Sequence, residues 1–227
     1  MSDFVIEPHP RPAVPVEGGG LFPVRRLYCI GRNYADHAIE MGHDPTCEAP
    51  FFFQKNADSI DLSGEFPYPP ETEDVHFEIE LVVALGRGGR DMPEAKTLGN
   101  VWGYGVGLDM TRRDLQGAAK KAGRPWEIGK AFDRAAPMSP PVPVARCGHP
   151  ASGRIALSLN GETRQDGDLD RMIWKVPEMI AYLSRYFERA AGDLIMTGTP
   201  AGVGAVVLDD VLSGSIEGVG TLDVRVV

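Results

Sequence analysis

The sequence has few cysteines and no apolar run of the roughly 20 residues needed to cross a bilayer. Its cysteines are Cys29, Cys47 and Cys147, which form no C-x-x-C pair. This spacing argues against a disulfide framework and a cysteine zinc site, and it favours reduced thiols in a cytoplasmic protein. The N-terminus carries acids and prolines instead of a basic segment and an apolar run, so it does not read as a signal peptide.

The sequence also contains fewer basic than acidic residues. Lys and Arg number 23 against 32 Asp and Glu, which gives a formal net charge of −9. Binding to nucleic acid or to an anionic membrane depends on a basic surface, so neither partner is expected. A local site for a small anion is still compatible with this balance. The 43% hydrophobic and 24% charged content is ordinary for a globular protein.

The chain length of 227 residues suits one large domain. Residues 1–24 contain five prolines and three consecutive glycines, a composition that predicts an extended N-terminal arm and not a packed element. Residues 25–227 are expected to form a single domain.

Strand-like patterns, either alternating or short apolar runs, outnumber helical ones along this domain. Strands are expected at 26–30, 51–55, 75–83, 101–108, 155–159 and 194–197 and at the C-terminus, and helices at 34–41, 111–122 and from Pro177 onward. Asn160-Gly161 predicts a tight hairpin turn, and the glycines at 103, 105 and 107 predict close packing against one strand face. No regular β-α-β repeat occurs. The predicted fold class is therefore mainly β with some α, or α+β.

The stretch 75–83 is the most informative of these strands. Apolar residues alternate there with His76, Glu78 and Glu80, so both glutamates face one side, about 6.5 Å apart. Two like charges on a strand otherwise suited to burial are unfavourable unless a cation or water compensates them. The alternative interpretation is an ordinary exposed polar face, and the strand alone leaves both open.

A third acid, Asp109, ends the predicted strand that begins at Val101. With Glu78 and Glu80 it would form an all-oxygen site, which Mg²⁺ or Mn²⁺ prefers over Zn²⁺. The alternative is that Asp109 caps the helix that follows it, so the spacing is compatible with a metal site without requiring one.

His37 and Glu40 lie three residues apart on the predicted helix 34–41, so they share a face and can touch. Such a pair can act as a general base and the carboxylate that orients it. An exposed surface pair is the alternative. Other catalytic patterns are missing: there is no G-x-S-x-G, residues 123–130 lack the spacing of a phosphate loop, and no helix follows the Gly198 loop.

Four segments in succession resemble one known family. They are Gly31-Arg32-Asn33-Tyr34-Ala35-Asp36-His37, His76-Phe77-Glu78-Ile79-Glu80-Leu81, Leu108-Asp109-Met110-Thr111-Arg112-Arg113-Asp114-Leu115-Gln116 and Thr197-Gly198-Thr199-Pro200-Ala201-Gly202-Val203-Gly204. From about Arg26 to Val227 the chain resembles the fumarylacetoacetate hydrolase family, in its single-domain acylpyruvase branch. Residues 123–126 and 130–133 are most similar to those of fumarylpyruvate hydrolases.

The resemblance implies a mixed β-sandwich roll, a single catalytic domain and a homodimer. It implies a divalent cation, Mg²⁺ or Mn²⁺, on Glu78, Glu80 and Asp109, with His37 and Glu40 on a lid above it. Lys130 would be a third catalytic residue. The positions implied to bind substrate are Arg32, Arg113, Gln116, Gly198 and Thr199.

The implied reaction is hydrolysis of a C–C bond in a 2,4-dioxo acid, with fumarylpyruvate as the expected substrate, to pyruvate and a carboxylic acid in the catabolism of aromatic compounds. His37 would activate water and Lys130 would stabilise the departing enolate. The same site would also suit an oxaloacetate decarboxylase or a 2-oxo acid tautomerase or isomerase. A metal-binding dimer without turnover is a third alternative, against which the His37/Glu40 pair argues.

Overall fold

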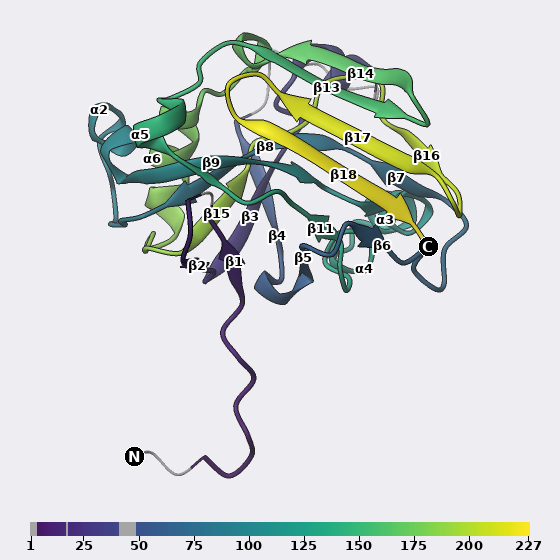
Figure 1. Cartoon of the computed structure of the whole chain (residues 1–227), viewed down its shortest axis with the longest axis horizontal. Helices are drawn as coiled ribbons and strands as arrows, with labels where there is room; N and C mark the ends of the chain where they lie inside the picture. The colour runs from purple at the N-terminus through teal and green to yellow at the C-terminus, as the bar shows by residue number, and fades with distance from the viewer. Residues whose placement is uncertain (1–3, 17, 41–48) are drawn as a thin grey trace.

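Two large sheets dominate the computed structural model, which describes residues 4–16, 18–40 and 49–227 (Figure 1). The six-stranded sheet has the order β12 (Val142–Pro143), β9 (Val101–Leu108), β8 (Ile79–Leu85), β15 (Asp193–Met196), β3 (Arg26–Gly31) and β4 (Phe51–Lys55). The five-stranded sheet has the order β14 (Glu162–Asp168), β13 (Arg154–Leu159), β17 (Val211–Ile216), β18 (Gly220–Val226) and β6 (Glu65–Phe66). Both sheets mix parallel and antiparallel pairs, because β15 runs parallel to β3 and β18 parallel to β6.

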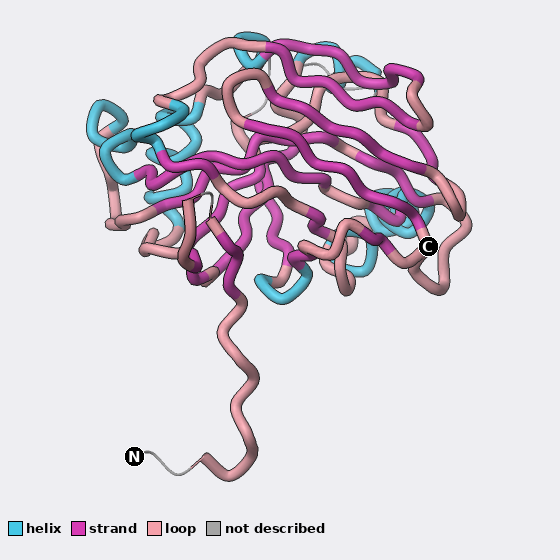
Figure 2. The backbone as a smooth tube through the Cα atoms, in the orientation of Figure 1, coloured by secondary structure: helices cyan, strands magenta, loops and turns pink. Residues whose placement is uncertain are grey.

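Smaller sheets and short helices complete the described part of the chain. The smaller sheets are β10 (Thr111–Arg112) with β7 (Val75–Phe77) and β16 (Gly204–Val206), β11 (Ala136–Pro137) with β5 (Ile60–Asp61), and β1 (Ala13–Pro15) with β2 (Leu21–Pro23). The α-helices are α1 (Ala35–Glu40), α2 (Glu94–Thr97), α3 (Arg113–Lys121), α4 (Glu127–Lys130), α5 (Val144–Cys147) and α6 (Val176–Tyr186). Figure 2 shows these helices around the edges of the strands. Among the residues described, no helix has the length and apolar character to cross a membrane.

The main hydrophobic core lies between the two large sheets. Ile79, Leu81 and Val83 of β8 are buried there together with Ile155 and Leu157 of β13. The alternate residues of β8 face the other way, as strand geometry requires. Val82 and Ala84 belong to a second cluster on that opposite face, and Glu80 shares their side of the strand.

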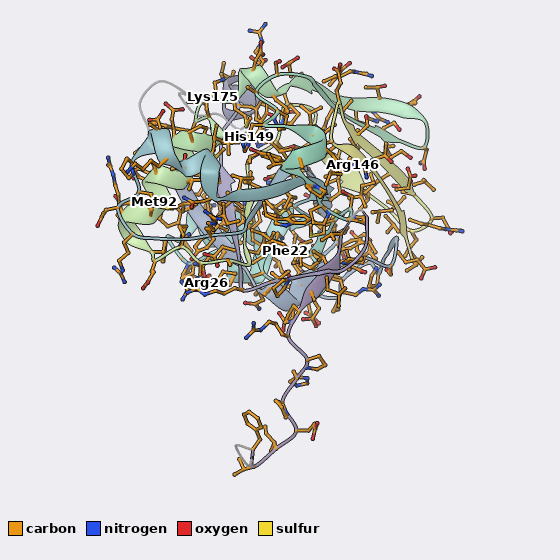
Figure 3. All side chains as sticks on the ribbon, turned by 60° about the vertical axis from the view of Figure 1, so that its left-hand side comes forward. Phe22, Arg26, Met92, Arg146, His149 and Lys175 are labelled. Atoms are coloured by element: carbon orange, nitrogen blue, oxygen red, sulfur yellow. The ribbon has the colours of Figure 1, made fainter. Side chains whose placement is uncertain are left out.

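The N-terminal segment differs from the expected extended arm. β1 and β2 pair antiparallel, and their Val14 and Phe22 are buried in the second cluster. The Phe22 ring lies 5.5 Å from the Trp102 ring, and Figure 3 places Phe22 within the body of the molecule. Residues 4–12 contain no helix or strand and extend away from the domain in Figure 1. The apolar residues between the prolines supply the buried contacts that composition alone did not reveal.

The predicted strand 75–83 is interrupted at Glu78. β7 pairs with β10 and β16, whereas β8 pairs with β9 and β15 in the large sheet. At the interruption Glu78 O accepts a hydrogen bond from Asp109 N at 2.9 Å, and Ile79 N donates to the side chain of Gln165 at 3.0 Å. The chain thus passes from one sheet to another where the two glutamates lie.

Several local predictions are confirmed. Asn160 and Gly161 have φ values of 52° and 84°, as a type I′ hairpin turn requires. β9 packs closely on its glycine face, since a Cβ at Gly103 would lie 2.3 Å from Val142 O. The expected helix 34–41 is α1, which ends at Glu40, and Met41 lies outside the described residues.

Candidate active site

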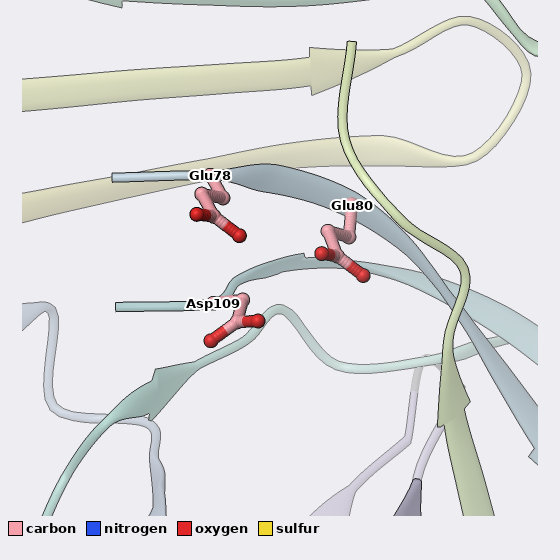
Figure 4. Close-up of side chains that lie close together, drawn as sticks. All are labelled: Glu78, Glu80 and Asp109. Atoms are coloured by element: carbon pink, nitrogen blue, oxygen red, sulfur yellow. The ribbon is translucent and has the colours of Figure 1, made fainter. Parts of the chain in front are cut away.

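Three acidic side chains from two strand regions converge on one buried place. Glu78 follows β7, Glu80 lies in β8 and Asp109 follows β9. One oxygen from each lies within 4.8 Å of those of the other two, and the residues are only 5%, 2% and 1% exposed. Figure 4 shows the three carboxylates gathered around a common space. The predicted grouping of these acids is therefore present in the structure.

Cationic side chains hold two of the three acids. Lys130 Nζ donates to Glu78 Oε2 at 2.9 Å and to Asp109 Oδ2 at 2.8 Å. Arg113 Nη2 donates to the other oxygen of Glu78. Lys55 Nζ lies 2.9 Å from Asp109 Oδ1, and both residues are buried.

Glu80 differs from the other two acids. Its Oε2 accepts a hydrogen bond from Gly198 N at 2.7 Å, and no described cationic side chain forms an ion pair with it. Burial, with Asp109 and Glu78 close by, raises the pKa of Glu80 well above its ordinary value. Burial also opposes ionisation of Glu78, but Lys130 and Arg113 outweigh it and hold the pKa of Glu78 well below its usual range.

This arrangement fits a divalent cation. Hard cations such as Mg²⁺ and Mn²⁺ prefer carboxylate oxygens, and the three acids present such oxygens close to one another. A cation beside Glu80 would stabilise its charged form against the burial and the neighbouring acids that raise its pKa. Glu78, Glu80 and Asp109 are the residues that would hold it.

His37 and Glu40 form the expected pair on α1. His37 Nδ1 lies 3.2 Å from Glu40 Oε2, and His37 is 6% exposed. Both oxygens of Glu40 lie 3.3 Å from Gly202 N, so the 198–204 loop also holds this carboxylate. His37 borders the same cavity as the three acids.

The loop after β15 connects these groups. Gly198 has a φ of 92°, which favours glycine, and a Cβ there would lie 2.7 Å from Asn33 Cβ. Asn33 Nδ2 donates to Thr197 O at 2.8 Å and to Trp174 O at 2.9 Å, while its Oδ1 accepts from Trp174 N. Asn33 thus joins the loop to the segment before α6.

A cavity of about 150 Å³ lies over the acids. Besides the three acids and His37, the residues selected from the sequence that line it are Arg32, Arg113, Gln116, Lys130, Gly198 and Thr199. Glu40 does not line the cavity, but it contacts His37, which does. His76 is not among the lining residues; its Nε2 lies 2.9 Å from Asp74 Oδ1.

The sequence did not indicate the aromatic wall of this cavity. Phe51, Phe53 and Trp126 line it together, with ring centroids 5.3 to 6.4 Å apart. A cation lies against two of the rings: Lys130 Nζ is 5.1 Å from the Phe53 centroid, and the Arg32 guanidinium is 5.2 Å from that of Phe51. The three rings thus form one aromatic wall that has the acid-bound Lys130 beside Phe53 and a second basic residue beside Phe51.

The sequence also did not indicate the buried contacts of Lys55 and Gln165. A lysine ending the apolar run 51–55 was visible, but its burial against Asp109 depends on the sheet that brings β4 beside β3. Gln165 lies in a polar hairpin strand where nothing distinguishes it from its neighbours.

The chain is similar to proteins of a known family. The family model described as fumarylacetoacetate (FAA) hydrolase C-terminal matches residues 26–227. A fumarylpyruvate hydrolase of Ralstonia sp is 43% identical, and the match covers 81% of this chain and 95% of that protein. An oxaloacetate tautomerase of Escherichia coli (strain K12) is 41% identical, and the match covers 87% of this chain and 90% of that protein.

A solved structure is similar over the whole length. The crystal structure of fumarylpyruvate hydrolase from Pseudomonas aeruginosa in complex with Mn²⁺ and pyruvate has a TM-score of 0.97 and 51% identity, and the match covers 99% of each chain. The fold is thus the mixed α+β architecture of this enzyme class, as predicted.

The chain belongs to the fumarylacetoacetate hydrolase family. The similar proteins include fumarylpyruvate hydrolases that it matches over 95% and 99% of their length, which confirms the resemblance identified in the motifs.

Proposed function

We propose that the protein is a divalent-metal-dependent hydrolase that cleaves the C–C bond of a 2,4-dioxo acid, with fumarylpyruvate as its best candidate substrate. The observation that carries this proposal is that His37, held by Glu40, borders the same cavity as the three acids. A relative whose crystal structure contains Mn²⁺ and pyruvate adds support for both the cation and the product.

His37 is suited to activate water. Its Nδ1 faces Glu40, and a proton on Nδ1 directed at this carboxylate leaves Nε2 unprotonated. Nε2 can then remove a proton from a water molecule whose oxygen bonds to the C4 carbonyl carbon of the substrate. The proton held at Nε2 later returns to C3 of the product.

The C3–C4 bond breaks when the tetrahedral adduct collapses, and its electron pair remains on the pyruvate half as an enolate. A divalent cation on Glu78, Glu80 and Asp109, Mg²⁺ or Mn²⁺, would supply positive charge for that enolate. Lys130 contributes positive charge at the same place, because Asp109 and Glu78 outweigh the effect of burial and raise its pKa above the ordinary value. It therefore stays protonated.

Arg113 and Gln116 are proposed to hold the substrate carboxylate. Arg113 Nη1 donates to Gln116 Oε1 at 2.7 Å, which directs the amide group of Gln116. With its oxygen engaged, the Gln116 side chain offers N–H donors to a carboxylate. Gly198, whose loop borders the cavity, and Thr199 are proposed to contact the substrate as well.

The aromatic wall favours fumarylpyruvate over simpler acyl groups. A planar, conjugated acyl chain can lie against Phe53, Trp126 and Phe51. Its distal carboxylate would then reach Arg32, which lies beside Phe51. Action in the catabolism of aromatic compounds, a homodimeric state and a cytoplasmic location are parts of the same proposal.

A tautomerase acting on oxaloacetate is the second candidate, favoured by the 41% identity to a relative of that name. Tautomerisation needs proton transfers but no attacking water. The decarboxylase alternative would release carbon dioxide and leave the same enolate.

One assay panel separates these candidates. Purified protein with Mg²⁺ or Mn²⁺ receives fumarylpyruvate, acetylpyruvate and oxaloacetate, while pyruvate, carbon dioxide and the enol absorbance are followed. Hydrolysis predicts equimolar pyruvate and fumarate from fumarylpyruvate. Loss of the oxaloacetate enol signal without pyruvate or carbon dioxide identifies a tautomerase, and no turnover of any substrate by the metal-loaded protein overturns the enzyme proposal.

A further inference from the structure

Gln165 is a fully buried amide in an otherwise mostly exposed strand. It lies in β14, at the edge of the five-stranded sheet, and its exposed fraction is 0%. A buried amide is unfavourable unless its hydrogen bonds are satisfied. Its partners therefore explain why it points inward.

A β-bulge turns Gln165 toward the site. Leu157 pairs with Gln165 but Ser158 pairs with Thr163, so Arg164 has no partner in the ladder. Bulges of this kind change the direction of neighbouring side chains. The bulge also brings the Arg164 carbonyl against the 198–204 loop, where a Cβ at Gly202 would lie 2.1 Å from Arg164 O.

Two backbone groups fix the orientation of the Gln165 amide. Ile79 N donates to Gln165 Oε1 at 3.0 Å, and Gln165 Nε2 donates to Pro200 O at 2.8 Å. A backbone N–H can only donate and a carbonyl oxygen can only accept, so the reversed amide would lose both bonds. Nε2 therefore faces the loop.

The same nitrogen makes the Thr199 hydroxyl oxygen a hydrogen-bond acceptor. Gln165 Nε2 lies 2.8 Å from Thr199 Oγ1 and has only protons to offer, so the hydroxyl oxygen accepts this bond. Its own proton then points elsewhere, and no acceptor for it occurs among the described residues. Thr199 borders the cavity and is 2% exposed, so the direction left for this proton is toward a ligand.

We propose that Gln165 is a positioning residue that holds the Thr199 hydroxyl as a hydrogen-bond donor toward an anionic ligand in the cavity. Through Ile79 it also fixes the backbone between Glu78 and Glu80. The inference rests on the proposed function only in taking a carboxylate or oxo oxygen as the acceptor.

The test measures binding, so it does not depend on turnover. Pyruvate and fumarate are titrated separately into Mn²⁺-loaded wild type, Gln165→Glu, Thr199→Val and the double variant, and affinities are obtained by calorimetry. Gln165→Glu keeps the acceptor for Ile79 N but has no N–H for Thr199 Oγ1. The hydroxyl proton would then turn toward the introduced carboxylate and away from the ligand.

We expect Gln165→Glu to weaken binding of at least one anion about tenfold in the presence of Thr199, and less than twofold in the Thr199→Val background. Repulsion between the new carboxylate and the ligand would persist in both backgrounds and so would show as equal losses. Equal losses, wild-type affinity of Thr199→Val for both anions, or a wild type that binds neither anion would each overturn the proposal. Failure of hydrolysis alone would leave these affinities unchanged.

Further variants keep the test decisive. Thr199→Ser retains a hydroxyl and is expected to bind within twofold of wild type. If Gln165→Glu does not fold, Gln165→Met, which also lacks an N–H for Thr199 Oγ1, takes its place in the double-variant cycle with the same expected outcomes. Tenfold weaker binding by Thr199→Ser would also overturn the proposal. Gln54→Glu, at an exposed position of β4, introduces the same charge elsewhere and is expected to change neither affinity.

Discussion

Lys55 Nζ lies 2.9 Å from Asp109 Oδ1, while Lys130 holds the other oxygen of the same carboxylate at 2.8 Å. Lys55 also donates to Met110 O at 3.0 Å. A buried lysine from β4 thus fixes the acid that follows β9, and links the edge of the large sheet to the candidate metal centre.

Replacing Lys55 by Met should destabilise the protein, because it leaves a buried carboxylate with one cation fewer. Breaking a buried ion pair typically costs about 3–5 kcal/mol. Denaturant unfolding at neutral pH checks the size of this loss, and Lys96→Met, at an exposed position, provides the control. Equal stability of the two variants would show that the Lys55–Asp109 contact contributes little.

Replacing Glu80 by Gln should weaken Mn²⁺ binding about 100-fold, since a neutral amide replaces a carboxylate that faces the other two acids. Calorimetry with Mn²⁺ measures this change against Glu94→Gln, an exposed control on α2. Wild-type Mn²⁺ affinity in Glu80→Gln would remove Glu80 from the set of ligands.

Adding Mn²⁺ should raise the free energy of unfolding of the wild type. A ligand that binds only the folded state stabilises it by about 2.7 kcal/mol at 100 times its Kd. Thermal unfolding with and without Mn²⁺ measures the effect, which should be nearly absent in Glu80→Gln. A cation that stabilises both proteins equally would be binding elsewhere.

Replacing His37 by Ala should lower kcat for hydrolysis by about 10²–10⁴, the usual contribution of a general base. Mn²⁺ affinity should change less than threefold, because His37 is not one of the three grouped acids. Steady-state pyruvate release and calorimetry measure the two quantities, with His9→Ala, in the exposed N-terminal segment, as control. Full hydrolytic activity of His37→Ala would contradict its assignment as the base.

Replacing Arg32 by Met should lower kcat/KM for fumarylpyruvate roughly tenfold or more, by loss of a hydrogen bond to a charged group. Crotonylpyruvate, which has a methyl group in place of the distal carboxylate, should be affected less than twofold. Arg87→Met at an exposed turn is the control. Equal losses on both substrates would mean that Arg32 does not recognise the distal carboxylate.

Local sequence patterns predicted much of this molecule. Short apolar runs correctly placed β3, β4 and β15, and Asn160-Gly161 correctly placed a hairpin turn, because each depends on residues adjacent in the chain. Strand periodicity and a third acid at a strand end were compatible with the grouping of Glu78, Glu80 and Asp109, and the resemblance of the motifs to the family implied it.

Features that depend on distant segments were not predictable. The interruption at Glu78 follows from pairing with β10 and β16 on one side and with β9 and β15 on the other. The contacts of Lys55 and Gln165 arise in the same way, since their partners lie far along the chain. Periodicity describes which face a side chain occupies but not which segment covers that face.

The change of sheet at Glu78 has a consequence for folding kinetics. The bonds that define the site join positions 118 residues apart at Glu80 and Gly198 and 86 apart at Ile79 and Gln165. Contacts of such long range close late and slowly. Refolding protein should therefore recover cation binding only in its final phase, and a nascent chain that has not yet emerged as far as Gly198 should carry all three acids without a working centre.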